Sequence, residues 1–408
     1  MNNNKVFIAY IPGMDTRNLS KGWTPFISEC LKNYAWSKIF TNPSNEVLST
    51  LITGMNPHEH GIWQLKTKES LDSVREEKLT DKIPDIFTVA IQAFRHQFFH
   101  NCDVPTIPPR RRRAFELRRV KFRGRANTSD LLQQLGHVPS ILNSMDKGNV
   151  IYSFSDRLND QQTLLSSVAN GEAKLEFLQF HALDMLGHWQ LNTEEKLENV
   201  YSQVDSFLRN LYEKCESKGI RMVIVSDHGQ EKVIGDINIK KKINQIDVPQ
   251  NEFNYYIQPM QARFWFHSNR AREQILKALK EVTPGNILHF EDLHKFNIDF
   301  KSPDYGEVYF IPEPGYLLFP HDFYHPLVNL VFGVKDPQQR NRILNPKHVA
   351  YHGYLPHHDS EKGLLLLTDN LSKLNQTEIN AADIAPTLLS MVDQAKPDFM
   401  SGISRLVA

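Results

Sequence analysis

The sequence of 408 residues has no long hydrophobic run, no excess of one sign of charge and few cysteines. No stretch approaches the roughly 18–20 apolar residues that a helix needs to cross a bilayer, which argues against a membrane protein. Lys plus Arg and Asp plus Glu both number 47, so the formal net charge is zero. The chain as a whole therefore has no electrostatic attraction for nucleic acid or acidic membranes, and any preference for an anion must be local.

The three cysteines, Cys30, Cys102 and Cys215, are widely spaced and odd in number. This pattern argues against a disulfide framework and against a cysteine-based zinc site, and it favours a reducing compartment. The apolar stretch at residues 6–11 is too short for the hydrophobic part of a secretory signal. We therefore expect a cytoplasmic protein, and its oligomeric state stays open.

Alternating strand and helix patterns predict an α/β core around a mostly parallel sheet. Uninterrupted apolar runs predict buried strands at residues 6–11, 175–183, 221–225 and 363–368. Residues 193–218 are charged, with apolar side chains three or four positions apart, which is typical of an amphipathic helix. Further helices are predicted at 46–55 and 381–392. A strand, a helix and a strand in this order favour a right-handed parallel crossover.

Two segments depart from this alternation. Residues 233–347 mix aromatic strand-like and helical pieces, which predicts a smaller α+β cap inserted into the core. The core is then expected to comprise residues 1–232 and 348–408, with residues 103–125 as an Arg-rich loop of its first part. That loop is either a solvated segment or an anion-attracting patch, because arginine binds phosphate oxygens in pairs. It lacks interleaved aromatic residues to stack on bases, which argues against nucleic-acid binding.

Acids and histidines follow the predicted strands, at the sheet edge where open parallel sheets bind ligands. Asp184 and His188 bracket a turn that contains a glycine, so a carboxylate oxygen and an imidazole nitrogen can meet on one ion. Asp227 and His228 come directly after the next strand, and His352 is a further candidate. One such pair is more often a cap than a ligand, but their coincidence on neighbouring strands favours a metal site.

Ser44, at the predicted start of the helix 46–55, is the candidate nucleophile. A hydroxyl at a helix start lies beside free N–H groups and the positive end of the helix dipole, where a phosphate can dock. An adjacent divalent ion lowers the pKa of such a hydroxyl and activates it. Ser44 can equally be an ordinary helix cap. Its neighbour Asn45 either donates to a phosphate oxygen or only caps the helix.

Together, these motifs resemble the alkaline phosphatase superfamily, and especially its type I phosphodiesterase/nucleotide pyrophosphatase families. The resemblance rests on Ser44, then Thr53-Gly54, Pro57 and His60-Gly61, then Asp184 with Gly187-His188, then Asp227-His228-Gly229, and last His352-Gly353. The order and approximate spacing agree over most of the chain. The resemblance implies an alkaline-phosphatase-like central sheet flanked by helices.

The resemblance also implies a phosphate-ester hydrolase that acts on a phosphorylated small molecule through a phosphoseryl intermediate on Ser44. It implies two divalent ions, usually zinc and sometimes manganese. Asp184, His188 and His352 would hold one ion, and Asp227, His228 and the Ser44 oxygen the other. A phosphomonoesterase, a phosphonate hydrolase, a phosphoryl transferase or a degenerate phosphate-binding protein with one metal remain alternatives. The exact substrate is not determined by the sequence.

One departure from the family concerns the second ion. The first strand of the family normally ends in Asp-Gly, and this Asp joins the second metal, whereas this chain has Pro12-Gly13. Proline cannot ligate a metal. Asp15 lies three residues further on and is the candidate substitute. Without it, we expect the second site to be weaker than the first.

Overall fold

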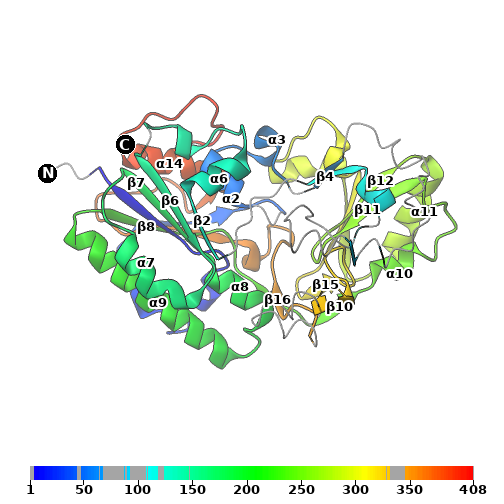
Figure 1. Ribbon diagram of the computed structural model, residues 1–408, viewed down its shortest axis with the longest axis horizontal. Coiled ribbons are helices and arrows are strands. Elements are labelled where there is room, and N and C mark those ends of the chain that lie inside the picture. Colours follow the sequence, from blue (N-terminus) through cyan, green and yellow to red (C-terminus); the bar gives the residue numbers. More distant parts are fainter. Residues whose placement is uncertain are drawn as a thin grey trace.

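The computed structural model describes residues 4–43, 47–63, 65–67, 87, 90–91, 107, 109–117, 124–146, 148–327, 329–330 and 345–407. Its described part has two lobes, a core with a large sheet and a cap with a smaller one (Figure 1). The core sheet has eight strands in the order β18-β2-β17-β8-β1-β7-β6-β5. The core sheet contains strands from both ends of the chain.

The centre of the core sheet is parallel. Strand β1 (Val6–Tyr10) lies between β7 (Leu175–Phe180) and β8 (Arg221–Ser226), parallel to both. The other strands are β2 (Trp36–Phe40), β5 (Arg125–Asn127), β6 (Val150–Ser155), β17 (Gly363–Leu367) and β18 (Glu378–Asn380). Strands β17 and β5 pair antiparallel with their neighbours. The predicted α/β fold with a mostly parallel sheet is therefore confirmed.

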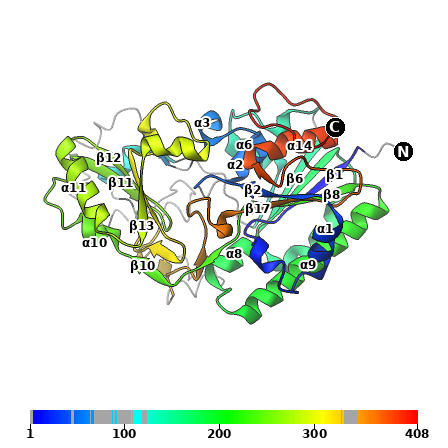
Figure 2. The same ribbon diagram turned by 180° about the vertical axis from the view of Figure 1, so that it is seen from behind.

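Helices cover both faces of the core sheet (Figures 1 and 2). On one face lie α1 (Pro25–Asn33), α7 (Gln161–Ser167), α8 (Ala182–Trp189) and α9 (Glu194–Ser217). On the other lie α2 (Val47–Thr53), α6 (Thr128–Leu135) and α14 (Ile384–Met391), with α3 (Pro57–His60) next to α2. Short 3₁₀ helices lie at Thr16–Asn18, Ile141–Asn143, Leu158–Asp160, Phe290–Phe296, Pro303–Tyr305, Asp359–Glu361 and Ala381–Asp383.

Helix α9 shows how the sequence produces these layers. Its apolar stripe, which includes Val204 and Leu208, is buried against the sheet, while its opposite face carries the charged residues. The Thr193 side chain accepts from the Lys196 N–H, and acidic residues occupy the first turn, which favours the helix start. None of the described helices, α9 included, is long and apolar enough to cross a membrane.

The cap is a four-stranded antiparallel sheet backed by two helices. Its strands, in sheet order, are β11 (Phe253–Ile257), β12 (Ala262–Phe266), β14 (Val308–Pro312) and β13 (Gly285–His289). Helices α10 (Ile239–Ile243) and α11 (Asn269–Lys280) share one buried apolar cluster with this sheet. The described part of the cap thus has a hydrophobic cluster of its own, and the bounds 233–347 stay a prediction.

Short ladders lie where the chain leaves the core for the cap and where it returns. Strand β9 (Glu231–Lys232), where the chain leaves the core, pairs antiparallel with β16 (Ala350–Tyr351), where it returns. Strand β10 (Gly235–Ile237) pairs in parallel with β15 (Tyr316–Leu318). The segments just before residue 233 and just after residue 347 are therefore hydrogen-bonded to each other.

The described part of the Arg-rich segment packs on the cap and not on the core. Helix α5 (Pro109–Arg112) precedes β4 (Phe115–Leu117), which pairs with β3 (Leu65–Thr67). Phe115 is buried in one cluster with Tyr256 and Trp265 of the cap. The assignment of residues 103–125 to a loop of the core stays a prediction, and the described part contributes Phe115 to a cluster shared with the cap sheet.

Arg111 shows what one of the arginines does. Its guanidinium lies over the Tyr255 ring at 4.0 Å and donates to the Asp322 carboxylate at 3.2 Å. Lys240 contacts the same carboxylate at 2.9 Å, and the Asp322 side chain is fully buried. Burial raises the pKa of Asp322, but the Arg111 and Lys240 charges overcome it and hold the pKa below its ordinary value. The positive charge of Arg111 is thus balanced inside the cap.

Replacing Asp322 is predicted to destabilise the protein strongly. Asp322→Asn leaves Arg111 and Lys240 without their buried counter-charge, and we expect the free energy of unfolding to fall by about 3–5 kcal/mol. The matched control is Asp292→Asn, because Asp292 pairs with the more exposed Lys295 at 2.7 Å. That change should cost about 0–1 kcal/mol, as solvent screens the pair. Urea denaturation measures both.

The effect of Asp322→Asn should also depend on pH. The folded-state pKa of Asp322 is depressed, so its ion pairs contribute stability above the unfolded value of about 3.9. This contribution is lost as the pH falls through the lower folded-state pKa. The stability difference between wild type and variant should therefore shrink between about pH 7 and about pH 3. An equal difference at both pH values would contradict the role of the ion pairs.

Candidate active site

The predicted acids and histidines lie at one edge of the core sheet. Strand β1 is parallel to β7 and β8, so the carboxyl ends of all three strands meet at this edge. Helix α8 follows β7 and carries Asp184 and His188, and Asp227 and His228 directly follow β8. His352 comes from the segment that returns from the cap, directly after β16. Strand order alone therefore gathers residues that are far apart in the chain.

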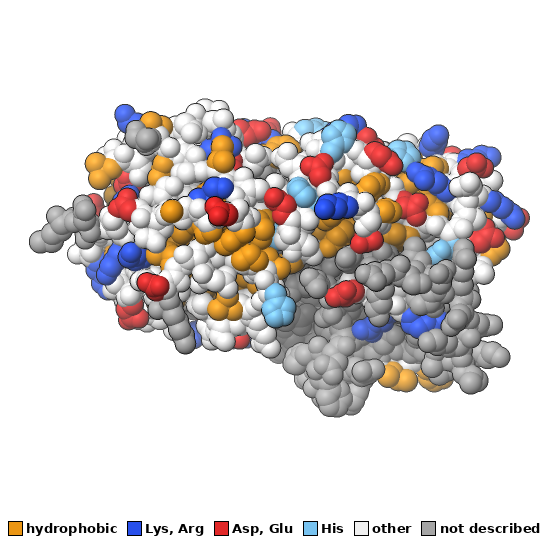
Figure 3. Space-filling model, turned by 90° about the horizontal axis from the view of Figure 1, so that it is seen from above, with side chains coloured by type: hydrophobic (Ala, Val, Ile, Leu, Met, Phe, Trp, Pro, Cys, Tyr) orange, Lys and Arg blue, Asp and Glu red, His pale blue; other side chains and the backbone are white. Residues whose placement is uncertain are grey.

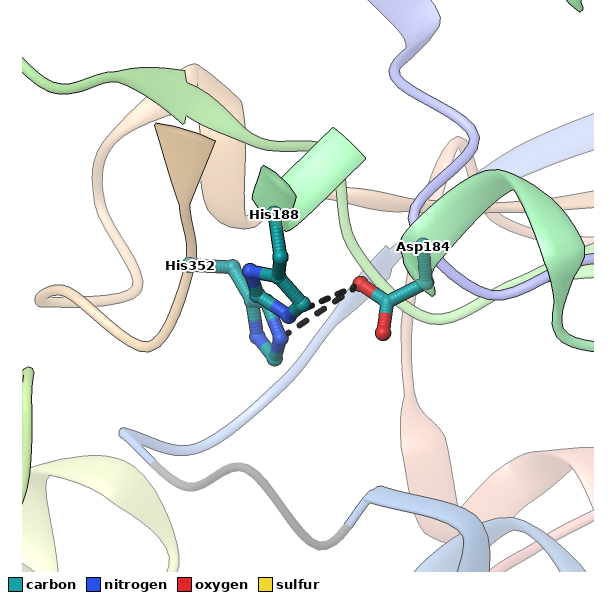
Figure 4. Close-up of side chains that lie close together, drawn as sticks. All are labelled: Asp184, His188 and His352. Atoms are coloured by element: carbon teal, nitrogen blue, oxygen red, sulfur yellow. Dashed lines mark ion pairs between the residues drawn. The ribbon is translucent and has the colours of Figure 1, made fainter. Parts of the chain in front are cut away.

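Asp184, His188 and His352 form a compact group. His188 Nε2 lies 3.4 Å and His352 Nε2 lies 3.6 Å from Asp184 Oδ1. One nitrogen or oxygen atom from each residue lies within 4.8 Å of the others, and both imidazole rings point toward the carboxylate (Figure 4). Within the described part of the chain, this is the one group of three or more such side chains with metal-binding spacing. One carboxylate and two imidazoles suit a divalent ion such as zinc.

The local structure around Asp184 differs from the sequence prediction. Strand β7 ends at Phe180, three residues earlier than predicted, and α8 begins at Ala182. Asp184 and His188 therefore lie one helical turn apart on the same face of α8, and do not bracket a turn. A Cβ at Gly187 would lie 1.7 Å from the Gln230 side-chain oxygen, so a larger residue there would displace the Gln230 amide that contacts Asp184.

Neighbouring side chains orient this group. His188 Nδ1 lies 3.1 Å from the Ala350 carbonyl oxygen, which accepts its hydrogen and so orients the ring with Nε2 facing Asp184. Gln230 Nε2 donates to Asp184 Oδ1 at 2.7 Å, and His181 Nε2 lies 3.2 Å from Oδ2. Burial opposes ionisation of Asp184, but the nearby histidines hold its pKa well below its usual range. The group thus presents an anionic carboxylate.

Asp227 and His228 lie directly beside this group. The His228 ring stacks on the His352 ring, with centroids 3.5 Å apart and planes 13° apart. His228 Nε2 lies 3.2 Å from Asp227 Oδ2, and its Nδ1 lies 2.9 Å from the Gly229 carbonyl oxygen. The Tyr10 hydroxyl donates to Asp227 Oδ2 at 2.6 Å. Asp227 and His228 are therefore adjacent to the group of Asp184, His188 and His352. The Asp227 carboxylate accepts hydrogen bonds from other side chains of the protein.

The turn after β1 runs between the two acids. Gly13 has a φ of +74°, and its N–H donates to Asp227 Oδ1 at 3.2 Å. A Cβ at this position would lie 3.0 Å from the Cα and Cβ of Asp184. Glycine is therefore required for both the backbone angle and the close approach to Asp184. Pro12, where the family has its ligand Asp, contributes no donor atom.

Asp15, the predicted substitute, has other partners. Arg17 donates to both carboxylate oxygens, with its Nη2 at 2.6 Å from Oδ2, and the Gln230 N–H also donates to Oδ2. Arg17 further contacts Glu231 Oε2 at 2.7 Å and the Gln230 carbonyl oxygen at 2.8 Å. Asp15 is not part of the group formed by Asp184, His188 and His352. Asp15 instead connects the loop that follows β1 to the loop that follows β8 through its hydrogen bond with the Gln230 N–H.

Ser44 and Asn45 lie outside the described residues; the described helix α2 begins at Val47. The rest of the motif that follows them has a structural role. His60 is buried, its Nε2 lies 3.1 Å from the Thr50 hydroxyl, and its Nδ1 accepts from the Ile62 N–H. Burial lowers the pKa of His60 to about 3, so the ring is neutral. It ties α2 to the turn after α3.

Sequence reasoning missed several polar partners of the site: Tyr10, His181, Gln230 and Glu361. Glu361 accepts from the Gly353 N–H at 2.7 Å and so holds the loop that carries His352. Gln230 directly follows Asp227-His228-Gly229, and this position was its one sequence signal. Tyr10 reads as part of a buried apolar strand, and nothing in that pattern indicates a contact with Asp227.

Aromatic rings extend from the metal group to the cap. His348 lies between the two lobes, with its centroid 4.0 Å from Trp189 of α8 and 5.9 Å from His321 of the cap. It is also 5.6 Å from His188. The space-filling view shows histidines at the surface near the middle of the molecule, beside a band of hydrophobic side chains (Figure 3). The cap therefore borders the edge of the sheet that carries the candidate site.

Comparison with solved structures agrees with this architecture. Human ectonucleotide pyrophosphatase/phosphodiesterase 5 superposes with a TM-score of 0.60 at 15% identity, covering 99% of this chain and 100% of that one. The murine protein in an inactive form with AMP gives a TM-score of 0.56 at 15% identity, with 96% of each chain covered. At this identity, the likeness shows a shared fold.

Sequence comparison identifies the family. A curated relative, ectonucleotide pyrophosphatase/phosphodiesterase C27A7.3 of Caenorhabditis elegans, is 31% identical over 64 residues, which is 16% of this chain. The aligned part spans only 9% of the length of that relative. The sequence pattern of the type I phosphodiesterase / nucleotide pyrophosphatase family, in contrast, matches residues 10–354. This match covers most of the chain and confirms the resemblance seen in the motifs. The chain belongs to the type I phosphodiesterase / nucleotide pyrophosphatase family.

Proposed function

We propose that this protein is a metal-dependent hydrolase of phosphate esters that cleaves a phosphodiester or pyrophosphate bond in a nucleotide-like small molecule. The observation that carries the proposal is the convergence of Asp184, His188 and His352 at the carboxyl edge of the sheet. Family membership supports the reaction type. The AMP complex of the murine relative supports a nucleotide as the phosphorylated substrate.

Asp184, His188 and His352 would hold the divalent ion, which we propose to be zinc, with manganese as the alternative. Three protein ligands with a further open position are typical of catalytic zinc sites. When bound there, the ion would polarise a phosphoryl oxygen and offset negative charge that develops on it. His181 and Gln230 keep the Asp184 carboxylate in place. A second ion would use Asp227, His228 and the Ser44 oxygen.

We assign Ser44 as the nucleophile. Its Oγ would attack phosphorus, the alcohol or phosphate on the far side would leave with the bond electrons, and water would then hydrolyse the phosphoserine. Asn45 would donate a hydrogen bond to a phosphoryl oxygen. Hydrolysis of monoesters or phosphonates, or transfer to another alcohol, would use the same residues. These reactions differ only in the leaving group or the acceptor, so assays with different esters distinguish them.

The expected setting follows from the same features. Of the described cysteines, Cys30 and Cys215 are free and buried, and a cytoplasmic location stays a prediction. We expect no membrane partner and no nucleic-acid partner, because the neutral net charge gives no attraction to either. The state of assembly is not predicted.

Removing the Ser44 hydroxyl is predicted to abolish turnover. For Ser44→Ala we expect a loss of at least about 1,000-fold in hydrolysis of bis-p-nitrophenyl phosphate, because the covalent intermediate cannot form. The control is Ser217→Ala at the exposed end of α9, which should keep wild-type rates. If Ser44→Ala keeps more than about a tenth of the activity, Ser44 is not the nucleophile.

Removing one histidine of the metal group is predicted to weaken metal binding. His188→Ala should lower zinc affinity by at least about 10–100-fold, the loss seen when even an outer partner of a ligand is removed. The exposed His357 gives the matched control, His357→Ala. Zinc content after dialysis against buffered zinc measures both variants. Equal zinc contents in His188→Ala and wild type would contradict the assignment.

A further inference from the structure

The two halves of the expected two-ion site are not equivalent in this chain. In the first half, two imidazole nitrogens face one oxygen of Asp184 at 3.4 and 3.6 Å. In the second half, the described donors are Asp227 and His228. The family ligand at the end of the first strand is absent, because Pro12 occupies that position. The second half therefore lacks one full negative charge.

The protein already saturates the carboxylate of the second half. The N–H groups of Gly13 and His228 donate to Asp227 Oδ1 at 3.2 and 3.0 Å. The Tyr10 hydroxyl donates to Oδ2 at 2.6 Å, and His228 Nε2 lies 3.2 Å from the same oxygen. A carboxylate offers about four lone-pair positions, so these four contacts occupy all the positions on Asp227. An ion could reach Asp227 only by displacing these donors, two of which are backbone groups.

Asp15 cannot supply the missing charge without losing strong partners. Its carboxylate is buried and accepts from the side chain and the backbone N–H of Arg17. The Asp15 Cγ lies so near Gly229 that a Cβ there would be 2.5 Å away. Arg17 is itself held by Glu231 and the Gln230 carbonyl oxygen. Releasing Asp15 would leave Arg17 with one carboxylate partner fewer and would remove a contact that holds the loop after β8.

We infer that this chain holds one divalent ion tightly, at Asp184, His188 and His352, and that hydrogen bonds from Tyr10 and Gly13 hold Asp227 where relatives bind a second ion. The inference deepens the proposed function and rests on its metal group. Asp227 and His228 then act by position: the Asp227 contacts fix His228, and the stacked His228 ring supports the His352 ring.

Counting metal ions in the full chain tests the inference without any measurement of turnover. Purified apo-protein is dialysed against a series of buffered zinc concentrations, and bound zinc is measured by elemental analysis. We expect one ion per chain to saturate at concentrations at least about 100-fold below any second ion. Two ions that saturate together in wild type would overturn the inference.

Restoring the missing carboxylate gives the second arm. Pro12→Asp should raise the tightly bound zinc from one ion to two, whereas Pro12→Asn, which has the same shape and no charge, should stay at one. Thermal melts show whether each variant is folded. If folded Pro12→Asp stays at one ion, or Pro12→Asn also gains one, the missing charge does not set the count. Should either variant fail to fold, the wild-type count still decides.

This result separates the inference from the proposed function. A wild type that binds one tight ion but hydrolyses no phosphate ester would overturn the function and keep the inference. A wild type that hydrolyses esters and binds two equally tight ions would support the proposed function and overturn the inference. His188→Ala tests whether the single ion lies at Asp184, His188 and His352. If it does, this variant should retain no tightly bound zinc.

Discussion

Two buried carboxylates on either side of β1 determine how the rest of the site is built. Asp184 and Asp227 are each almost fully buried, and burial and the Asp184 charge both oppose ionisation of Asp227, but His228 and the Tyr10 hydroxyl hold the pKa of Asp227 below its ordinary value. In a medium of low dielectric, such a pair persists only when cations or hydrogen-bond donors surround it. The histidines, Gln230 and the β1 turn provide these groups. The polar network beneath the site follows from this need, and His188 and His352 of the candidate metal site belong to that network.

Much of the fold could be predicted because it depends on local patterns. The apolar runs at residues 6–11 and 363–368 correspond to β1 and β17, and the apolar stripe at 193–218 corresponds to α9. The end of β7 was misplaced because Ala182 and Leu183 continue the apolar run and yet begin α8. A run of apolar residues cannot show where a buried strand becomes a buried helix.

The site was predictable where motifs carry it and obscure where distant contacts do. Asp184, His188 and His352 converge as the motifs imply, whereas the contacts of Tyr10 with Asp227 and of Gln230 with Asp184 join residues more than 40 positions apart. The same limit applies to the Arg-rich segment. Its charge suggested a solvent-facing loop, but Arg111 and Phe115 belong to the interior of the cap.

The pairing of β9 with β16 connects the base of the cap to the segments that carry His228 and His352. Strand β9 begins two residues after Gly229, in the loop that carries His228, and β16 ends directly before His352. The ladder between them joins, at the base of the cap, the two segments that carry the stacked rings. The ladder thus lies at the junction of the two lobes. The same hydrogen-bonded ladder therefore holds the base of the cap together and sets the separation of the segments that carry His228 and His352.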